Sequence, residues 1–181
     1  MNTQQPTVAP NVVIPFNERS PRMDVKFLLP FIQAAAEVLT AEIGGPVERG
    51  DIALHRTAYT MNEVNVILTI VGRLQGVVIY GMSQATALGM VSQIIGEPMQ
   101  EMDELVQSGI AEIGNVITGR ASVLLASAGY VTNISVPTLV IGKAMISVLD
   151  FHRLAVPLKF KHGQLEVHLT LREAVAGDGR N

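Results

Sequence analysis

Three short segments rich in Val, Ile and Thr follow one another between residues 52 and 82, with breaks of only two residues between them. They are Ile52 to Thr60, Glu63 to Val71 and Leu74 to Met82. Residues of these types favour strands. A connection of two residues can only reverse the chain, because parallel strands need a long crossover. The segments therefore predict an antiparallel meander.

A helix-forming segment precedes these strands. Asp24 is a suitable N-cap for the stretch from Val25 to Ile43, which is rich in Ala, Leu and other helix formers. Gly44 and the nearby Pro46 form a stop signal. Pro30 lies near the beginning of this segment, where a helix tolerates proline but can bend at it. We expect one helix here.

Two further helices are predicted after the meander. Ser83 is positioned to cap a helix of about three turns that Gly96 closes. Asp103 opens a longer helix, which continues to about Ala126 and stops at Gly129. These cap and stop signals are local, so they predict the two helices without reference to the rest of the fold.

The remainder of the chain is again rich in strand-forming residues. We expect strands within 131–143, 152–161 and 164–173. The last two are joined through His162 and Gly163 and alternate polar with apolar residues, as in a hairpin with one face in solvent. The order of segments predicts an α+β fold in which helices pack on one face of an antiparallel sheet.

Length and composition limit the chain to one domain. Its 181 residues, 48% of them hydrophobic, are enough to bury a core of ordinary size. Residues 1–22 hold four prolines and several Asn, Gln and Ser, a composition that predicts a flexible tail. We expect the domain to span 23–174 and residues 175–181 to form a second, short tail.

The charge balance and the absence of cysteine exclude several kinds of function. A formal net charge of -3 with no basic run removes the attraction on which nucleic-acid binding depends. A chain without Cys has no disulfides, no thiolate metal site and no cysteine nucleophile. The four histidines show no metal-ligand spacing, so we expect no metal in this chain.

One charge-free run, Leu74 to Gly96, is long enough to span a membrane. Several Gln, Ser and Gly residues interrupt it, so we interpret it as a strand, a turn and a helix. The N-terminus lacks the basic region and solid apolar stretch of a signal peptide. We therefore expect a cytoplasmic protein that has no membrane partner.

The long helix from Asp103 has two unlike faces when each residue is placed at about 100° from the last. Its apolar residues fall within about 80° of one another and predict a buried stripe. On nearly the opposite side, four residues within about 60° form what we call the outer ridge. The stripe comprises Val106, Ile110, Ile113, Ile117, Ala121, Leu124 and Ala128, and the outer ridge comprises Ser108, Glu112, Asn115 and Gly119.

The outer ridge departs from an ordinary solvated helix face. Asn115 and Gly119 are poor helix formers, and on an outward face they bring no packing benefit in return. Leu105, Val116 and Val123 lie within about 60° of the ridge carboxylate and surround the polar pair with apolar groups. A docking surface explains both features.

The segment from Asp103 to Gly119, DELVQSGIAEIGNVITG, resembles the signature helix of the CheC, CheX and FliY family of chemotaxis phosphatases. It keeps all four ridge residues at the family's spacing. The order of the predicted elements resembles CheX in particular, including a Val-Pro-Thr segment at 136–138 before the final hairpin. The likeness covers the chain from about 24 to 173.

The resemblance implies a CheC/CheX-like fold, a homodimer, and hydrolysis of the phosphoaspartate of a CheY-type response regulator. It implies Glu112 and Asn115 as the catalytic residues. Asn115 would place a water in line with the acyl phosphate, a task for which a neutral carboxamide avoids repulsion from the phosphoryl oxygens. Glu112 would pair with a Lys of the partner and fix the docking register.

The same resemblance assigns the Mg²⁺ of the reaction to the receiver domain, so we expect no cofactor in this chain. We expect Ser108, Gly119, Leu105 and Val116 to contact the phosphorylated receiver rather than to take part in the chemistry. The alternative is a binding module that docks a receiver domain without accelerating hydrolysis.

Relatives with two active sites carry a second signature on their first helix. Here Gln33, Glu37, Thr40 and Gly44 keep the spacing but place Thr where the family has Asn. Because Thr is shorter and lacks an amide, we expect this copy to be inactive. The departure favours a single site, as in CheX.

Overall fold

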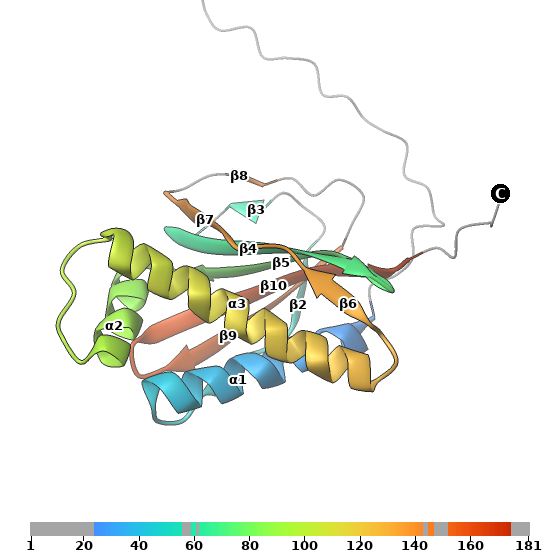
Figure 1. Ribbon diagram of the computed structural model, residues 1–181, viewed down its shortest axis with the longest axis horizontal. Coiled ribbons are helices and arrows are strands. Elements are labelled where there is room, and N and C mark those ends of the chain that lie inside the picture. Colours follow the sequence, from blue (N-terminus) through green and yellow to red (C-terminus); the bar gives the residue numbers. More distant parts are fainter. Residues whose placement is uncertain (1–23, 56–58, 61, 143–144, 147–151, 175–181) are drawn as a thin grey trace, which may run out of the picture.

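The computed structural model describes residues 24–55, 59–60, 62–142, 145–146 and 152–174. Within these ranges, three helices lie on one face of an antiparallel sheet (Figure 1), which confirms the predicted α+β fold. The predicted tails, 1–22 and 175–181, lie outside the described residues, and the domain bounds stay a prediction. The helices are α1 (Leu29–Ile43), α2 (Gln84–Ile95) and α3 (Glu104–Ser127).

Four long strands form the centre of the sheet in the order β9, β10, β5, β4, each antiparallel to its neighbour. Short strands extend both edges, since β1 and β2 pair with β9, and β6 and β7 pair with β4. β3 and β8 pair with each other. The strands are β1 (Glu48–Arg49), β2 (Ala53–His55), β3 (Tyr59–Thr60), β4 (Val64–Gly72), β5 (Leu74–Met82), β6 (Thr132–Ile134), β7 (Thr138–Ile141), β8 (Met145–Ile146), β9 (Arg153–Phe160) and β10 (Gly163–Glu173).

The predicted meander is confirmed for its second and third strands and wrong for its first. β4 and β5 form a hairpin, as do β9 and β10 near the C-terminus. The segment 52–60 instead provides β2, which pairs with β9 at the opposite edge of the sheet, and β3, which pairs with β8. The outer edge of β4 is occupied by β6 and β7, so it leaves no place for a preceding strand.

The first helix begins later than predicted. Asp24 is a cap, but it caps a single 3₁₀ turn, η1 (Val25–Phe27), where its Oδ1 accepts from the backbone N–H of Lys26 at 2.9 Å. α1 starts at Leu29, so Pro30 lies in its first turn, where the missing N–H costs no helical hydrogen bond. The proline therefore sets the start of α1.

The cap signals of the other two helices are confirmed. Ser83 Oγ accepts from a first-turn N–H of α2 at 3.1 Å, and Gly96 ends that helix in the left-handed conformation. Asp103 caps α3 in the same way, at 2.9 Å. The run 74–96 is β5 followed by α2, as predicted. No helix in the described part of the chain is long and apolar enough to cross a membrane.

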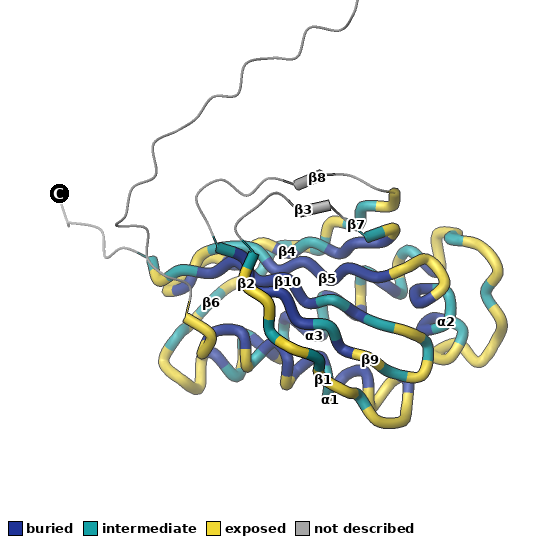
Figure 2. Tube along the Cα trace, turned by 180° about the vertical axis from the view of Figure 1, so that it is seen from behind, coloured by how far each residue is buried: buried dark blue, intermediate teal, exposed yellow. Residues whose placement is uncertain are grey.

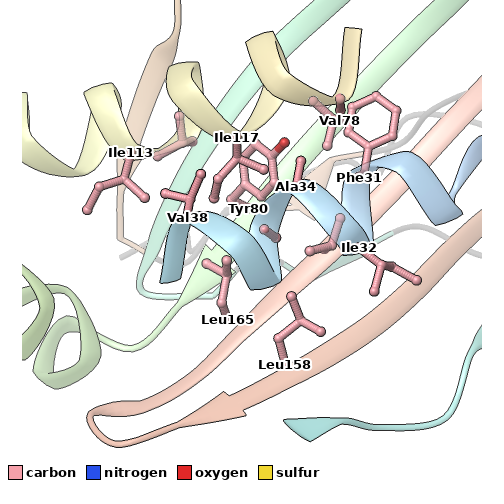
Figure 3. Packing of buried hydrophobic residues seen from close by; sticks show 14 of the residues in the cluster. Phe31, Ile32, Ala34, Val38, Val78, Tyr80, Ile113, Ile117, Leu158 and Leu165 are labelled. Atoms are coloured by element: carbon pink, nitrogen blue, oxygen red, sulfur yellow. The ribbon is translucent and has the colours of Figure 1, made fainter. Parts of the chain in front are cut away.

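The hydrophobic core lies between the helices and the sheet. Alternate residues of the four central strands are buried against the helices. Ile113 and Ile117 project from α3 toward Val38 of α1 and Tyr80 of β5 (Figure 3). The core thus fixes α3 over β4 and β5, on the side of the sheet that β6 and β7 extend, and leaves the other side of the helix facing outward.

The central strands are coloured buried or half-buried along most of their length in Figure 2, although the alternation of polar and apolar residues predicts one exposed face. On β10, His168 is 3% exposed and Thr170 is 5% exposed. Glu166 Oε2 accepts hydrogen bonds of 3.1 Å from Asn62 Nδ2 and from His168 Nε2. The hairpin is therefore not half-solvated: Arg153, His168 and Thr170 are buried on its second face, and Gln164, Glu166 and His168 bond to one another along β10.

Candidate functional site

α3 packs on the rest of the fold along two rows of buried residues, spaced four apart. Such rows are inclined to the helix axis, so the buried face rotates along α3. The predicted stripe is therefore right as far as Ala121 and wrong at its end, where Leu125 is buried, Leu124 is half-buried and Ala128 is exposed. The rows are Val106, Ile110, Gly114 and Thr118, and Ile113, Ile117, Ala121 and Leu125.

Two buried contacts fix the position of α3 on the sheet. Gly114 lies so close to the sheet that a Cβ on it would be 2.7 Å from Val66 Cγ1 and 3.3 Å from Tyr80 Cδ2. Thr118 Oγ1 donates to the carbonyl of Gly114 at 2.7 Å and accepts from the Tyr80 hydroxyl at 2.9 Å. Burial raises the pKa of Tyr80 well above its usual range, so the hydroxyl is a neutral donor.

Glu112 and Asn115 lie side by side on the outward face of α3, as predicted from their spacing. Asn115 Nδ2 is 3.4 Å from Glu112 Oε2, at the long end of the hydrogen-bond range. Glu112 is exposed and Asn115 is half-buried. The pair presents a carboxylate, which only accepts hydrogen bonds, beside an amide that both donates and accepts.

The other predicted contact residues share this face. Ser108 is exposed and Leu105 is 55% exposed. Val116 is half-buried, and a Cβ at Gly119 would meet no atom within 4 Å. Gly119 therefore has no packing role that requires glycine, unlike Gly114. Contact of these residues with a partner stays a prediction.

Beside this face lies a hollow of about 380 Å³, which we call the apolar groove. Helical periodicity in the sequence predicts only the α3 side of this groove. The missed wall comes from the end of α2, where the consecutive residues Ile94 and Ile95 are 41% and 38% exposed. Two consecutive large apolar residues on an amphipathic helix indicate an exposed apolar surface, because a single narrow apolar stripe does not bury both. The groove is lined by Val38, Val91, Ile94, Ile95, Leu105 and Val116, among others.

The second, altered signature lies on α1, next to α3. The carboxylate of Glu37 is engaged within the chain, since Oε1 accepts from Gln33 Nε2 at 2.9 Å and Oε2 is 3.9 Å from Arg120 Nη1. Thr40 is exposed beside it. The inactivity of this copy stays a prediction, and these contacts agree with it.

Within the described ranges, no group of three or more His, Cys, Asp or Glu side chains is arranged to hold a metal ion. A hollow of about 570 Å³ lies beside the start of α2 and is lined by Asn62, Ser83, Thr86 and Glu166, among others. Its lining includes no residue of α3. The outer ridge and the apolar groove therefore form the candidate site on their own.

A protein-family model described as chemotaxis phosphatase CheX matches residues 64–159. The match runs from the start of β4 to the end region of β9 and includes the whole of α3. It therefore covers both the outer ridge and the strands on which α3 packs.

Similar proteins extend the match over most of the chain. The CheY-P phosphatase CheX of Thermotoga maritima is 26% identical over 152 residues, which are 83% of this chain and 98% of that protein. The crystal structure of a CheX–CheY–BeF3–Mg²⁺ complex from Borrelia burgdorferi has a TM-score of 0.72 at 27% identity, covering 83% of this chain and 100% of that one. A CheC-like superfamily protein from Shewanella sp. PV-4 has the same fold, with a TM-score of 0.76 at 24% identity and coverage of 83% and 99%.

Proposed function

The chain belongs to the CheX family of chemotaxis phosphatases, and from this premise we propose that it hydrolyses the phosphoaspartate of a CheY-type response regulator. One observation carries the proposal: Glu112 and Asn115 lie together on the outward face of α3, 3.4 Å apart. The T. maritima relative is named a CheY-P phosphatase, and the B. burgdorferi relative was crystallised with CheY. Both names support this reaction and this substrate.

Asn115 positions the attacking water. Its Oδ1 accepts a hydrogen bond from the water, while Nδ2 donates either to Glu112, as in the free protein, or to a phosphoryl oxygen. A carboxylate in this place would repel the phosphoryl group. Hydrolysis of an acyl phosphate depends mainly on positioning and electrostatics, so an orienting amide is enough.

Glu112 docks the receiver. It is exposed and lies one turn before Asn115, so a cationic side chain of the partner can reach it without moving the amide. An ion pair at this point fixes which part of the receiver faces Asn115. Ser108 and Gly119 continue the same contact surface, and the open space at Gly119 admits a close approach of the partner's backbone.

The partner completes the chemistry. In this proposal the Mg²⁺ belongs to the receiver domain, where it neutralises phosphoryl charge, and the chain described here adds no metal of its own. The proposed site of action is the cytoplasm. The absence of cysteine agrees with a reducing compartment.

The chain is also proposed to form a homodimer through a sheet edge. The short strands β6 and β7 lie at one edge, and apolar residues are exposed beside and on them: Val131 at 62%, Val136 at 83% and Ile141 at 46%. Exposed edge strands with apolar side chains pair readily with a second copy. Sedimentation of the wild type and of Val136→Lys tests this, and a wild type that stays monomeric contradicts it.

The decay of a phosphorylated CheY-type receiver, followed with and without the full chain, tests the proposed activity. A phosphatase accelerates decay at concentrations far below that of the receiver, because each molecule turns over many times. A binding module associates with the receiver in a calorimetric titration but leaves its decay unchanged. That second result contradicts the proposed function.

A further inference from the structure

The apolar groove is an open feature of the surface with a buried floor. Val38 of α1 and Val91 of α2 form the floor and are each 1% exposed. Ile94 and Ile95 form one wall, and Leu105 of α3, which is 55% exposed, forms the other. Three large apolar side chains thus face solvent around a hollow of about 380 Å³, an arrangement typical of binding surfaces.

Contacts between α2, α3 and their connection fix the positions of the groove walls. α2 and α3 approach closely at Gly109, where a Cβ would lie 3.2 Å from Val91 Cγ2. The connection between them is pinned at both ends: Ser92 Oγ accepts from the N–H of Met99 at 2.8 Å, and Gln107 Nε2 donates to the carbonyl of Met102 at 2.7 Å. The groove is therefore formed before any partner binds, which reduces the ordering cost of binding.

The groove is continuous with the proposed active site. Ser108, Glu112 and Val116 belong to its lining and also to the outward face of α3. Leu105 precedes Glu112 by two helical turns, or about 10 Å along the axis. A protein interface of ordinary size covers about 800 Å² of each partner, a patch of about 16 Å radius. A receiver centred on Glu112 and Asn115 therefore covers the groove.

The rim of the groove is acidic. Glu42 of α1 and Glu112 of α3 both line it, and both are exposed. The complementary surface has an apolar side chain flanked by a basic one.

We propose that the apolar groove is the second docking point for the receiver, and that it takes an apolar side chain presented next to the basic residue that pairs with Glu112. This inference rests on the proposed function, since it makes the same receiver the occupant. The ion pair at Glu112 sets orientation, whereas the groove supplies affinity and selects among receivers by the size of the apolar side chain. A receiver with a polar residue at this point binds weakly.

Leu105→Ser tests the proposal, because it removes an exposed side chain and should change the free energy of unfolding little. The affinity for a receiver held in its phosphorylated form with beryllofluoride is measured by titration, and kcat and KM by phosphate release. We expect KM and Kd to rise about fivefold, since roughly half of a leucine side chain is left to bury, with kcat unchanged. Leu105→Ser combined with Ile94→Ser raises both by about tenfold or more.

The matched control is Leu54→Ser. Leu54 is 52% exposed, nearly the same as Leu105, but it lies on β2 at the edge of the sheet beyond β9. Its removal leaves Kd and KM at the wild-type values if the groove is a specific docking point. If Kd and KM rise equally in Leu105→Ser and Leu54→Ser, the proposal is overturned, because the result indicates only a general effect of surface hydrophobicity.

Other occupants give different results. If the groove joins two copies of this chain, Leu105→Ser with Ile94→Ser shifts the sedimentation of the protein and leaves receiver affinity unchanged, which overturns the proposal. The proposed function is tested apart from it. If the wild type binds the receiver without hydrolysing it, and Leu105→Ser binds more weakly, the groove proposal is supported and the proposed catalysis is contradicted. If the wild type hydrolyses the phosphoaspartate, and Leu105→Ser has the same Kd and KM as the wild type, the proposed function is supported and the groove proposal is overturned.

Discussion

Gly114→Ala is expected to reduce hydrolysis more than it reduces stability. The new Cβ would lie 2.7 Å from Val66 Cγ1 and 3.2 Å from Val66 Cβ, whereas carbon atoms in ordinary contact are about 3.5 Å or more apart. Val66 is fully buried and β-branched, so it has little freedom to turn away. α3 must therefore move from the sheet by up to about 0.8 Å at this turn.

The free energy of unfolding receives two opposed contributions. Alanine in place of glycine within a helix stabilises by about 1 kcal/mol, whereas overpacking a core costs about 1–3 kcal/mol. We expect a net loss of about 0–2 kcal/mol. Asn115 is the next residue, and its placement tolerates only about 0.5 Å of displacement. A shift near 1 Å costs up to about a hundredfold in rate, so kcat should fall by about ten- to a hundredfold.

Chemical denaturation measures the stability, and phosphate release from a phosphorylated receiver measures kcat. Adding Val66→Ala removes the nearest atom, Cγ1, and leaves contacts no closer than 3.2 Å, so Gly114→Ala with Val66→Ala should regain most of the kcat while remaining destabilised by the smaller core. Gly119→Ala is the control for helix propensity in the denaturation measurement, since its Cβ meets no atom of the chain within 4 Å. A Gly114→Ala protein that gains about 1 kcal/mol and keeps wild-type kcat would refute the reasoning.

Three further predictions concern docking, the support of α3 and pH. Glu112→Lys replaces attraction to the partner's cation with repulsion, so we expect weaker receiver binding, and equal affinity by titration calorimetry contradicts this. Tyr80→Phe removes one buried hydrogen bond but leaves Thr118 bonded to the carbonyl of Gly114, so chemical denaturation should show a loss of about 0.5–1.5 kcal/mol. Burial lowers the pKa of His168 below 6.5, and the hydrogen bond from His168 lowers that of Glu166 below 4.5. The unfolded chain therefore takes up these protons first as pH falls, so unfolding free energy should decrease below about pH 6.5 and again below about pH 4.5. In Glu166→Gln, the second decrease should be smaller; a curve identical to that of the wild type would contradict the assignment.

Local signals predicted the elements that carry the site. Caps at Ser83 and Asp103 and the left-handed Gly96 act within one turn, so the sequence alone identifies α2 and α3. The unusual positions of Asn115 and Gly119 on an outward face were likewise readable from helical periodicity. What these residues do came from the resemblance to a family, because side-chain identity alone does not specify a reaction.

Features that depend on distant pairing were not predictable in the same way. β2 pairs with β9, about a hundred residues further along the chain, and no local pattern records that partner. The apolar groove requires the ends of α1, α2 and α3 to meet, so Ile94 and Ile95 were not linked to Leu105 from sequence. Leu125 is buried where Leu124 was predicted to be. The difference follows from the inclined rows along which α3 packs, because a straight helical projection does not include this inclination.

The central claim is that Asn115 acts in the chemical step and not in docking. The most direct measurement compares the wild type and Asn115→Ala at saturating concentration, by the decay of the phosphorylated receiver, together with the Kd of each for the beryllofluoride form. We predict that Asn115→Ala loses about a hundredfold or more in the rate of hydrolysis while its Kd stays within about twofold of the wild type. An Asn115→Ala protein that hydrolyses the phosphoaspartate at the wild-type rate would contradict the account.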